Sequence, residues 1–231
     1  MNMALNVPPA IAKIAPDGNL TPRQKRQFLI QMALRRVKPG TGSAPEFMRE
    51  RTAMHNWPDL REILEGIDWV IIGGVATRAY MPERMTKDLD ILVRKSDGEA
   101  VIERLKKAGY KLVSRLAVEG YLMRSPQGVD VDVLFGKHPW LDEALTHPER
   151  DPAGYPVITL PYLIVLKLVA NRLRDMSDLA IMLGWAEEET LNKIREVVHR
   201  YLPNEKDDLE SMIFLGQHEQ KDSPDWNQTK Q

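Results

Sequence analysis

The sequence predicts an α+β protein whose centre alternates strands and helices in an α/β-like manner. Between residues 68 and 159, short apolar stretches typical of strands alternate with helical stretches. The regions before and after this centre carry only helical patterns, and hydrophobic residues make up 43% of the 231 positions. A chain of this size and composition can bury one good core and still carry a helical appendage. We therefore expect one central domain with helices on both sides of it.

The composition divides the chain into five segments. Prolines and glycines at the start predict a disordered N-terminus over residues 1–20. A helical N-terminal extension is expected over 21–67, the core over 68–159 and a C-terminal helical region over 160–216. The polar composition of residues 217–231 predicts a disordered tail.

Bulk properties exclude several classes of protein. The formal net charge is −1, so the chain has no global basic footprint for nucleic acid. Cysteine is absent, which excludes disulfides, cysteine zinc sites and a thiol nucleophile. The longest apolar run, residues 160–170, is too short for a membrane span and contains Lys167. The first residues lack the pattern of a signal peptide, so we expect a cytoplasmic protein that does not enter a membrane.

Helix signals mark both flanking regions. Thr21 followed by Pro22 has the pattern of an N-cap and a first helical residue, which predicts a helix over 21–37. A second helical segment is expected over 58–65. After the core we expect four helices, over residues 163–173, 177–183, 187–201 and 207–216.

The core begins with its most informative stretch, residues 69–93. It reads as a buried strand over 69–72, a turn at Gly73 and Gly74, a short helix, and a strand that carries Asp88 and Asp90. Further elements are expected as a helix over 97–108 that Gly109 ends and a helical turn over 142–145. Strands are expected over 110–116, 121–123, 129–135 and 157–159.

Asp88 and Asp90 are two carboxylates on one face of a strand, because residues i and i+2 point the same way. At a separation of about 4 Å and an effective dielectric near 20, their repulsion is on the order of 4 kcal/mol. A raised pKa, a basic neighbour or a bound cation would relieve it. Oxygen-only ligands suit Mg²⁺, with Mn²⁺ as the alternative ion. This pattern predicts a metal site.

A later strand supplies further carboxylates. Residues 129–135 begin with apolar and acidic residues in strict alternation, so Asp130 and Asp132 share one face. If this strand pairs beside the first, Asp132 or Asp130 completes a three-carboxylate site. Such a site holds two metals about 3.5–4 Å apart, and the third carboxylate is a natural acceptor for the proton of an attacking hydroxyl.

Gly73 and Gly74 lie where a strand turns into a helix. Glycine permits a positive φ and lets backbone amides approach a phosphate group. A simple tight turn is the alternative interpretation of this pair. The distance of fourteen positions between Gly74 and Asp88 leaves room for one short helix and a return to the sheet.

Together these motifs resemble the DNA polymerase beta-like nucleotidyltransferase superfamily. The residues that carry the resemblance are Ile72-Gly73-Gly74, Asp88-Leu89-Asp90-Ile91 and Val131-Asp132-Val133. The fuller stretch GGVATRAY…RMTKDLDILV is similar to the minimal nucleotidyltransferases of the AbiEii/MenT toxin type. The resemblance implies that type of fold, with a mixed central sheet, N-terminal helices and a C-terminal helical region.

The resemblance also implies roles for particular residues. Asp88, Asp90 and Asp132 would be the catalytic metal ligands, with Asp130 at a more variable position. Gly73 and Gly74 would hold the triphosphate of a nucleoside triphosphate. Arg84 and Thr86 match the Arg-x-Thr that precedes the Asp pair in such proteins, and would buttress the turn or contact phosphate; the nucleotide-binding set is therefore Gly73, Gly74, Arg84, Thr86 and Lys167.

Lys167 belongs to a second part of the resemblance, in which a Lys within an apolar helix precedes Arg-Asp-x-x-Asp. The latter residues are Arg174, Asp175 and Asp178 here. A lone Lys in such a helix must extend to solvent or be paired. It would either reach the triphosphate or form a structural ion pair with Asp175 or Asp178.

The function implied is Mg²⁺-dependent transfer of a nucleoside monophosphate from an NTP to an acceptor hydroxyl. The toxin-type relatives point to a tRNA 3′ end or a protein side chain as acceptor, and to a toxin–antitoxin component with a cognate antitoxin as partner. Two alternatives are a catalytically inactive nucleotide- or partner-binding module on the same fold and a small-molecule nucleotidyltransferase. The sequence names neither the NTP nor the oligomeric state.

Overall fold

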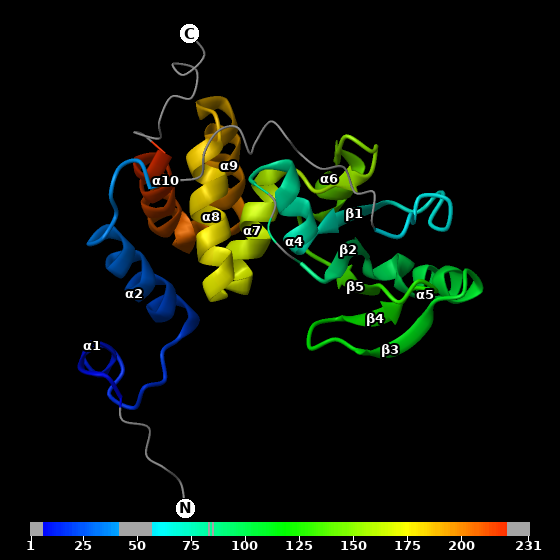
Figure 1. Cartoon of the computed structure of the whole chain (residues 1–231), viewed down its shortest axis with the longest axis horizontal. Coiled ribbons are helices and arrows are strands. Elements are labelled where there is room, and N and C mark those ends of the chain that lie inside the picture. Colours follow the sequence, from blue (N-terminus) through cyan, green and yellow to red (C-terminus); the bar gives the residue numbers. More distant parts are fainter. Residues whose placement is uncertain (1–6, 42–56, 83, 85, 221–231) are drawn as a thin grey trace, which may run out of the picture.

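The computed structural model describes residues 7–41, 57–82, 84 and 86–220. A sheet with its own short helices lies on one side of the molecule, and a group of longer helices lies on the other (Figure 1). Helices α4 and α7 lie between these two parts. This arrangement confirms the α+β class expected from the sequence.

The sheet has seven strands in the order β3-β4-β5-β2-β1-β7-β6. Its strands are β1 (Trp69–Ile72), β2 (Asp88–Arg94), β3 (Lys111–Arg115), β4 (Gly120–Arg124), β5 (Asp130–Gly136), β6 (Glu149–Arg150) and β7 (Pro156–Val157). β2 pairs with β1 in antiparallel and with β5 in parallel orientation, and β1 pairs with β7 in parallel. The sheet is therefore mixed, as expected, and β2 is its central strand.

The two faces of β2 carry different residues at its start. Leu89, Ile91 and Val93 are almost fully buried, as alternate residues facing the core should be. Asp88 and Asp90 lie on the opposite face and are only partly buried. β2 therefore holds the two carboxylates on a rigid backbone at the middle of the sheet.

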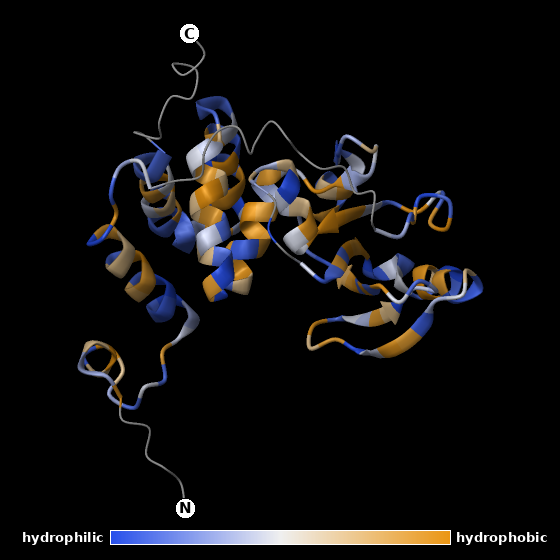
Figure 2. Ribbon diagram, viewed as in Figure 1, coloured by the Kyte–Doolittle hydropathy of each residue, from blue (hydrophilic) through white to orange (hydrophobic). Residues whose placement is uncertain are grey.

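Helices cover the sheet and form a second cluster. They are α1 (Pro9–Ala12), α2 (Pro22–Leu34), α4 (Gly73–Ala76), α5 (Gly98–Lys107), α6 (Leu141–Thr146), α7 (Leu160–Ala170), α8 (Leu173–Trp185), α9 (Glu188–Tyr201) and α10 (Lys206–Gln220). α7 packs against α8 and α9, and α10 packs against α8 and α2. Figure 2 shows long apolar stretches on α7 and α8, which lie inside this cluster. Within the described residues, no helix is both long and apolar enough to span a bilayer.

Two helix ends follow the capping pattern expected from the sequence. Thr21 caps α2, its hydroxyl accepting from the Gln24 amide at 3.2 Å while the Gln24 side chain accepts from the Thr21 amide at 2.9 Å. Gly109 follows α5 with φ of +87°, the left-handed conformation that favours glycine after a helix.

Other elements differ from the expectation. Residues 58–65 form a series of turns rather than a helix. β6 is an additional short strand, which two exposed polar residues did not reveal. The helix expected over 163–173 ends at Ala170, because Asn171 adopts a left-handed conformation with φ of 50°, and α8 then begins at Leu173.

The disorder predicted for the two ends of the chain also differs from the structure, where their residues are described. Residues 7–20, expected to be disordered, include helix α1. Residues 217–220, expected to begin a disordered tail, belong to α10. The remaining parts of these two predictions, residues 1–6 and 221–231, lie outside the described residues.

A buried arginine attaches α2 to the rest of the molecule. Arg26 is 3% exposed, and its Nε donates to Oδ2 of Asp208 at 2.6 Å. One terminal nitrogen of Arg26 donates to the Leu168 carbonyl at 3.1 Å, and the other pairs with Glu205. The N-terminal helix is thus connected to α7, to α10 and to the turn that precedes α10.

Candidate active site

Three carboxylates converge on the polar face of the sheet. The parallel pairing of β2 and β5 places Asp90 opposite Asp132 and Asp88 opposite Asp130. One carboxylate oxygen from each of Asp88, Asp90 and Asp132 lies within 4.8 Å of the other two. We call these three residues the acidic triad. β2 and β5 therefore pair directly, which was the condition for a three-carboxylate site.

Burial and charge repulsion act together on Asp90 in the triad. Burial, followed by the negative charges of Asp88 and Asp132, raises its pKa to about 7. Arg172 and the backbone amide of Gly74 act in the opposite direction. Burial and the neighbouring charges of Asp88 and Asp130 also raise the pKa of Asp132. Near neutral pH the triad therefore favours an added proton or a bound cation.

Asp130 has a different environment, although it shares a face with Asp132. Nε of Arg124, on β4, donates to Oδ1 of Asp130 at 2.7 Å, and NH2 of Arg124 donates to its Oδ2 at 3.1 Å. Hydrogen bonding from Arg124 lowers the pKa of Asp130. The carboxylate that joins Asp88 and Asp90 in the cluster is Asp132. The negative charge of Asp130 is instead balanced by Arg124 at the sheet surface.

Gly73 packs directly against the triad. Its φ is +64°, and a Cβ atom placed there would lie 2.0 Å from Oδ2 of Asp90. A side chain at this position would therefore collide with the carboxylate and would also strain the backbone. The glycine at the end of β1 allows the turn into α4 to pass close beside Asp90.

Gly74 allows a second close approach. A Cβ atom on Gly74 would lie 3.0 Å from the Thr86 hydroxyl and 3.2 Å from the guanidinium of Arg84. The Thr86 hydroxyl in turn donates to Oδ1 of Asp88 at 3.0 Å. Arg84 and Thr86 thus buttress the glycine turn and the start of β2, which is one of the two expectations for them.

Lys167 is buried in a network of ion pairs. Its Nζ lies 3.2 Å from Oδ1 of Asp175 and 2.6 Å from Oδ2 of Asp178. Asp178 also accepts two hydrogen bonds of 2.9 Å from Arg84, and Nε of Arg172 donates to Asp175 at 2.7 Å. The structure thus contains the ion pair that was the alternative interpretation of Lys167. We call Arg84, Asp178, Lys167, Asp175 and Arg172 the ion-pair network.

The sequence model of the family described as nucleotidyl transferase AbiEii toxin, type IV TA system, matches residues 59–231. This range covers most of the chain and contains the triad, the glycine pair and the ion-pair network. The chain belongs to the AbiEii family. The resemblance noted from the sequence is thereby confirmed, and the protein is a nucleotidyltransferase.

Solved structures give more distant matches. The antibiotic-resistance factor ANT(2'')-Ia is 13% identical, with a TM-score of 0.38, over 67% of this chain and 87% of that one. The Thermotoga maritima CCA-adding enzyme complexed with tRNA is 14% identical, with a TM-score of 0.36, over 73% of this chain and 49% of that one. A cytoplasmic RNA terminal U-transferase is 16% identical, with a TM-score of 0.29, over 74% and 47%. The search of curated proteins gives no match.

The AbiEii-family site contains an arginine that the sequence motifs did not single out. Arg172 immediately precedes α8, its side chain is 72% exposed, and it interacts electrostatically with Asp90. The motif had pointed to Arg174, which is exposed and makes none of the ion pairs found in the described part of the chain. No sequence signal marked Arg172, which becomes the N-cap of α8 only because the chain breaks at Asn171.

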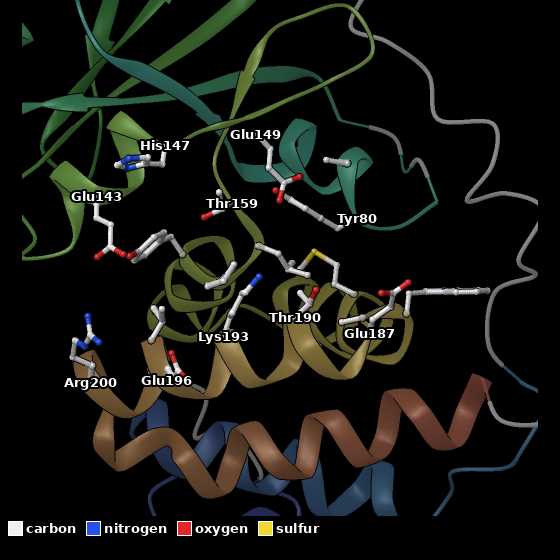
Figure 3. Close-up of a pocket in the computed structure, with 18 residues that line it drawn as sticks. Tyr80, Glu143, His147, Glu149, Thr159, Glu187, Thr190, Lys193, Glu196 and Arg200 are labelled. Carbon is white, nitrogen blue, oxygen red and sulfur yellow. The ribbon is translucent and has the colours of Figure 1, made fainter.

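A groove of about 800 Å³ lies elsewhere on this AbiEii-family protein. Residues near the C-terminal end of α8, including Met182 and Trp185, line it together with residues of α9. Figure 3 shows Lys193, Glu196 and Arg200 of α9 on one side, with Glu143 and His147 across from them. No member of the acidic triad lines this groove, and Arg172 lies at the other end of α8. The groove is therefore separate from the triad.

Proposed function

We propose that this protein transfers a nucleoside monophosphate from an NTP to an acceptor hydroxyl, with divalent metal bound at Asp88, Asp90 and Asp132. The observation that carries the proposal is the convergence of these three carboxylates from β2 and β5 within 4.8 Å. Membership of a nucleotidyltransferase family supports the reaction class.

The triad fits a hard divalent cation. All its donors are carboxylate oxygens, which suit Mg²⁺ or Mn²⁺, and the raised pKa of Asp90 marks a place where negative charge lacks compensation. Such an ion, when bound, neutralises charge on the phosphates and polarises the attacking hydroxyl. Thr86 holds the Asp88 carboxylate by its 3.0 Å hydrogen bond, and Gly73 leaves space for that of Asp90.

The remaining roles follow from the positions of the side chains. Asp132 is the proposed acceptor for the proton of the attacking hydroxyl, because burial and two neighbouring carboxylates raise its pKa. Gly73 and Gly74, together with Arg84, form the proposed binding region for the triphosphate. Attack of the hydroxyl on the α-phosphate then forms the new phosphate ester, and pyrophosphate leaves with the electrons of the broken bond.

The proposed acceptor is a tRNA 3′ end or a protein hydroxyl, and the proposed biological setting is a toxin–antitoxin pair in the cytoplasm. The description of the family as a type IV toxin supports the second part, with a cognate antitoxin as partner. A labelling experiment identifies the acceptor.

Labelling tests the proposal most directly. The purified protein is incubated with cell lysate, Mg²⁺ and each of four α-³²P-labelled NTPs in turn, and pyrophosphate release is measured in parallel. We expect labelled material that nuclease or protease digests, and none with Asp88→Asn. Full activity of Asp88→Asn at matched Mg²⁺ would contradict the metal site. NTP binding without turnover would favour an inactive binding module, and a label resistant to both digestions would favour a small-molecule acceptor.

A further inference from the structure

We infer that Lys167 is a positioning residue which, through Asp175 and Asp178, fixes Arg172 and Arg84 as the groups that contact the triphosphate. This inference rests on the proposed function and specifies how the chain binds its nucleotide. It assigns to Lys167 an indirect role and to Arg172 a direct one, which the sequence did not suggest.

The centre of the network is buried, and its two ends are more exposed. The side chain of Lys167 is 4% exposed, and those of Asp175 and Asp178 are 1% and 2% exposed. At the ends, Arg84 is 22% and Arg172 is 72% exposed. A phosphate group arriving from solvent therefore meets the two guanidinium groups, whereas the ammonium of Lys167 is enclosed.

Charge balance explains why the centre has to be a cation. Asp175 and Asp178 are buried carboxylates, and an unpaired buried charge is strongly unfavourable. Lys167 lies between them, and each carboxylate then takes one arginine as a second partner. The network holds three cations and two anions, so one positive charge remains, and it is available at the exposed arginines.

Both ends of the network are adjacent to the proposed site. The Arg84 guanidinium lies beside Gly74 and close to Thr86, which holds Asp88. Arg172, at the start of α8, is linked to Arg84 through the buried ion pairs of the network, and its charge lowers the pKa of Asp90. The two arginines therefore approach the triad from two different elements, as a clamp on a polyphosphate would require.

Each arginine keeps a donor nitrogen for a ligand. Arg84 uses Nε and NH2 for Asp178, and Arg172 uses Nε and NH2 for Asp175. In both residues NH1 makes no side-chain hydrogen bond among those found in the described residues. Guanidinium groups bind phosphate oxygens with strong charge-assisted hydrogen bonds, and a carboxylate that fixes their orientation reduces the entropy lost on binding. Direct contact by Lys167 would instead require breaking its bonds to two buried carboxylates.

Equilibrium binding to the full chain tests this assignment. Affinities for NTPs and for the corresponding NMPs are measured with Mg²⁺ by calorimetry for the wild type, Arg84→Gln and Arg172→Gln. Arg174→Gln is the matched control, because it removes an exposed arginine two positions after Arg172, in the first turn of α8. We expect each of the first two variants to bind NTP about 10- to 100-fold more weakly with little change for NMP, and the control to match the wild type.

A double-mutant cycle separates indirect from direct action of Lys167. If Lys167 acts through the arginines, Lys167→Met weakens NTP binding in the wild type but adds little in the Arg84→Gln/Arg172→Gln background. Equal weakening in both backgrounds would contradict the inference. If Lys167→Met does not fold by circular dichroism, the single arginine variants decide, because unchanged NTP affinity in both overturns the assignment. A wild-type chain that binds no NTP would instead contradict the proposed function.

Discussion

Asp90 and Asp132 are register partners on two parallel strands, although forty-two positions separate them in the sequence. This relationship builds the acidic triad, because Asp88 precedes Asp90 on the same face of β2. Asp130, two positions earlier on β5, pairs with Asp88 on one side and with Arg124 of β4 on the other. The sheet register therefore assigns different environments to two carboxylates that look equivalent in the sequence.

The first prediction uses this difference. Asp132→Asn should lower the rate of nucleotide transfer by at least about 100-fold, because it removes the proposed proton acceptor and a metal ligand. Asp130→Asn is the same chemical change two residues away. It should leave the rate of nucleotide transfer unchanged, because the Asp130 carboxylate is bound by Arg124. Pyrophosphate release at saturating NTP measures both rates. Comparable losses in the two variants would mean that the triad has been assigned to the wrong carboxylate.

The second prediction concerns pH and metal. The pKa of Asp90 is about 7 in the folded protein and near 3.8 for an ordinary aspartate, so the folded state holds this proton more tightly. Its contribution to stability is fully present below pH about 4 and is lost as pH rises to about 7, with an upper limit on the order of 4 kcal/mol.

Thermal melting of the metal-free protein should therefore show Tm falling across this pH range, and Asp90→Asn should flatten the fall. Added Mg²⁺ should raise Tm above pH 7 in the wild type and much less in Asp90→Asn. A wild-type melting curve that is indifferent to Mg²⁺ at pH 8 would argue against metal binding at the triad.

The third prediction separates contact from backbone strain at Gly73. Gly73→Ala adds a Cβ where Oδ2 of Asp90 lies and also places alanine at a positive φ. Gly66→Ala is the matched control, because Gly66 has φ of +76° with nothing within 4 Å of an added Cβ.

The control should lose about 1–2 kcal/mol of unfolding free energy from the backbone alone and keep its transfer activity. Gly73→Ala should lose more stability and most of its activity, since Asp90 has to move. Urea denaturation and the transfer assay measure the two effects. Equal stability losses at the two positions would show that the close approach to Asp90 contributes nothing.

The fourth prediction concerns the attachment of α2, which precedes the part of the chain matched by the family. Arg26→Leu should reduce the free energy of unfolding by about 3–5 kcal/mol, because Asp208 and Glu205 lose a buried partner. Arg23→Leu, an exposed change on the same helix, should stay within about 0.5 kcal/mol of the wild type. Adding Asp208→Asn to Arg26→Leu should recover part of the loss. Urea denaturation followed by fluorescence provides the measurement.

The sequence predicted the parts of the fold that depend on local pattern. Alternation identified β2 and β5, and capping residues located the start of α2 and the end of α5. It could not predict the turns at 58–65, because the helical spacing of their apolar residues is also satisfied by successive turns that bury Leu60 and Leu64. β6 is held by pairing with β7, and such long-range pairing leaves no pattern in two exposed residues.

The sequence predicted the candidate site to about the same extent as the fold. The motifs located the three carboxylates and the glycine pair, whereas the choice between Asp130 and Asp132 needed the strand register or a family resemblance. The role of Lys167 depended on how α7 and α8 face each other across a break. Neither that break nor the partner of Arg172 follows from spacing alone, because Asn171 is not a residue type that forces a helix to end.

Asn171 has a consequence for the evolution of this chain. Its left-handed conformation changes the direction of the chain between α7 and α8 within a two-residue connection, and this sets the rotation of α8 about its own axis. One inserted or deleted residue would rotate α8 by about 100° and carry Asp175 and Asp178 away from Lys167. The connection should therefore keep its length in natural variants even where its residue types drift, whereas the β3–β4 hairpin, remote from the network, should vary in length freely.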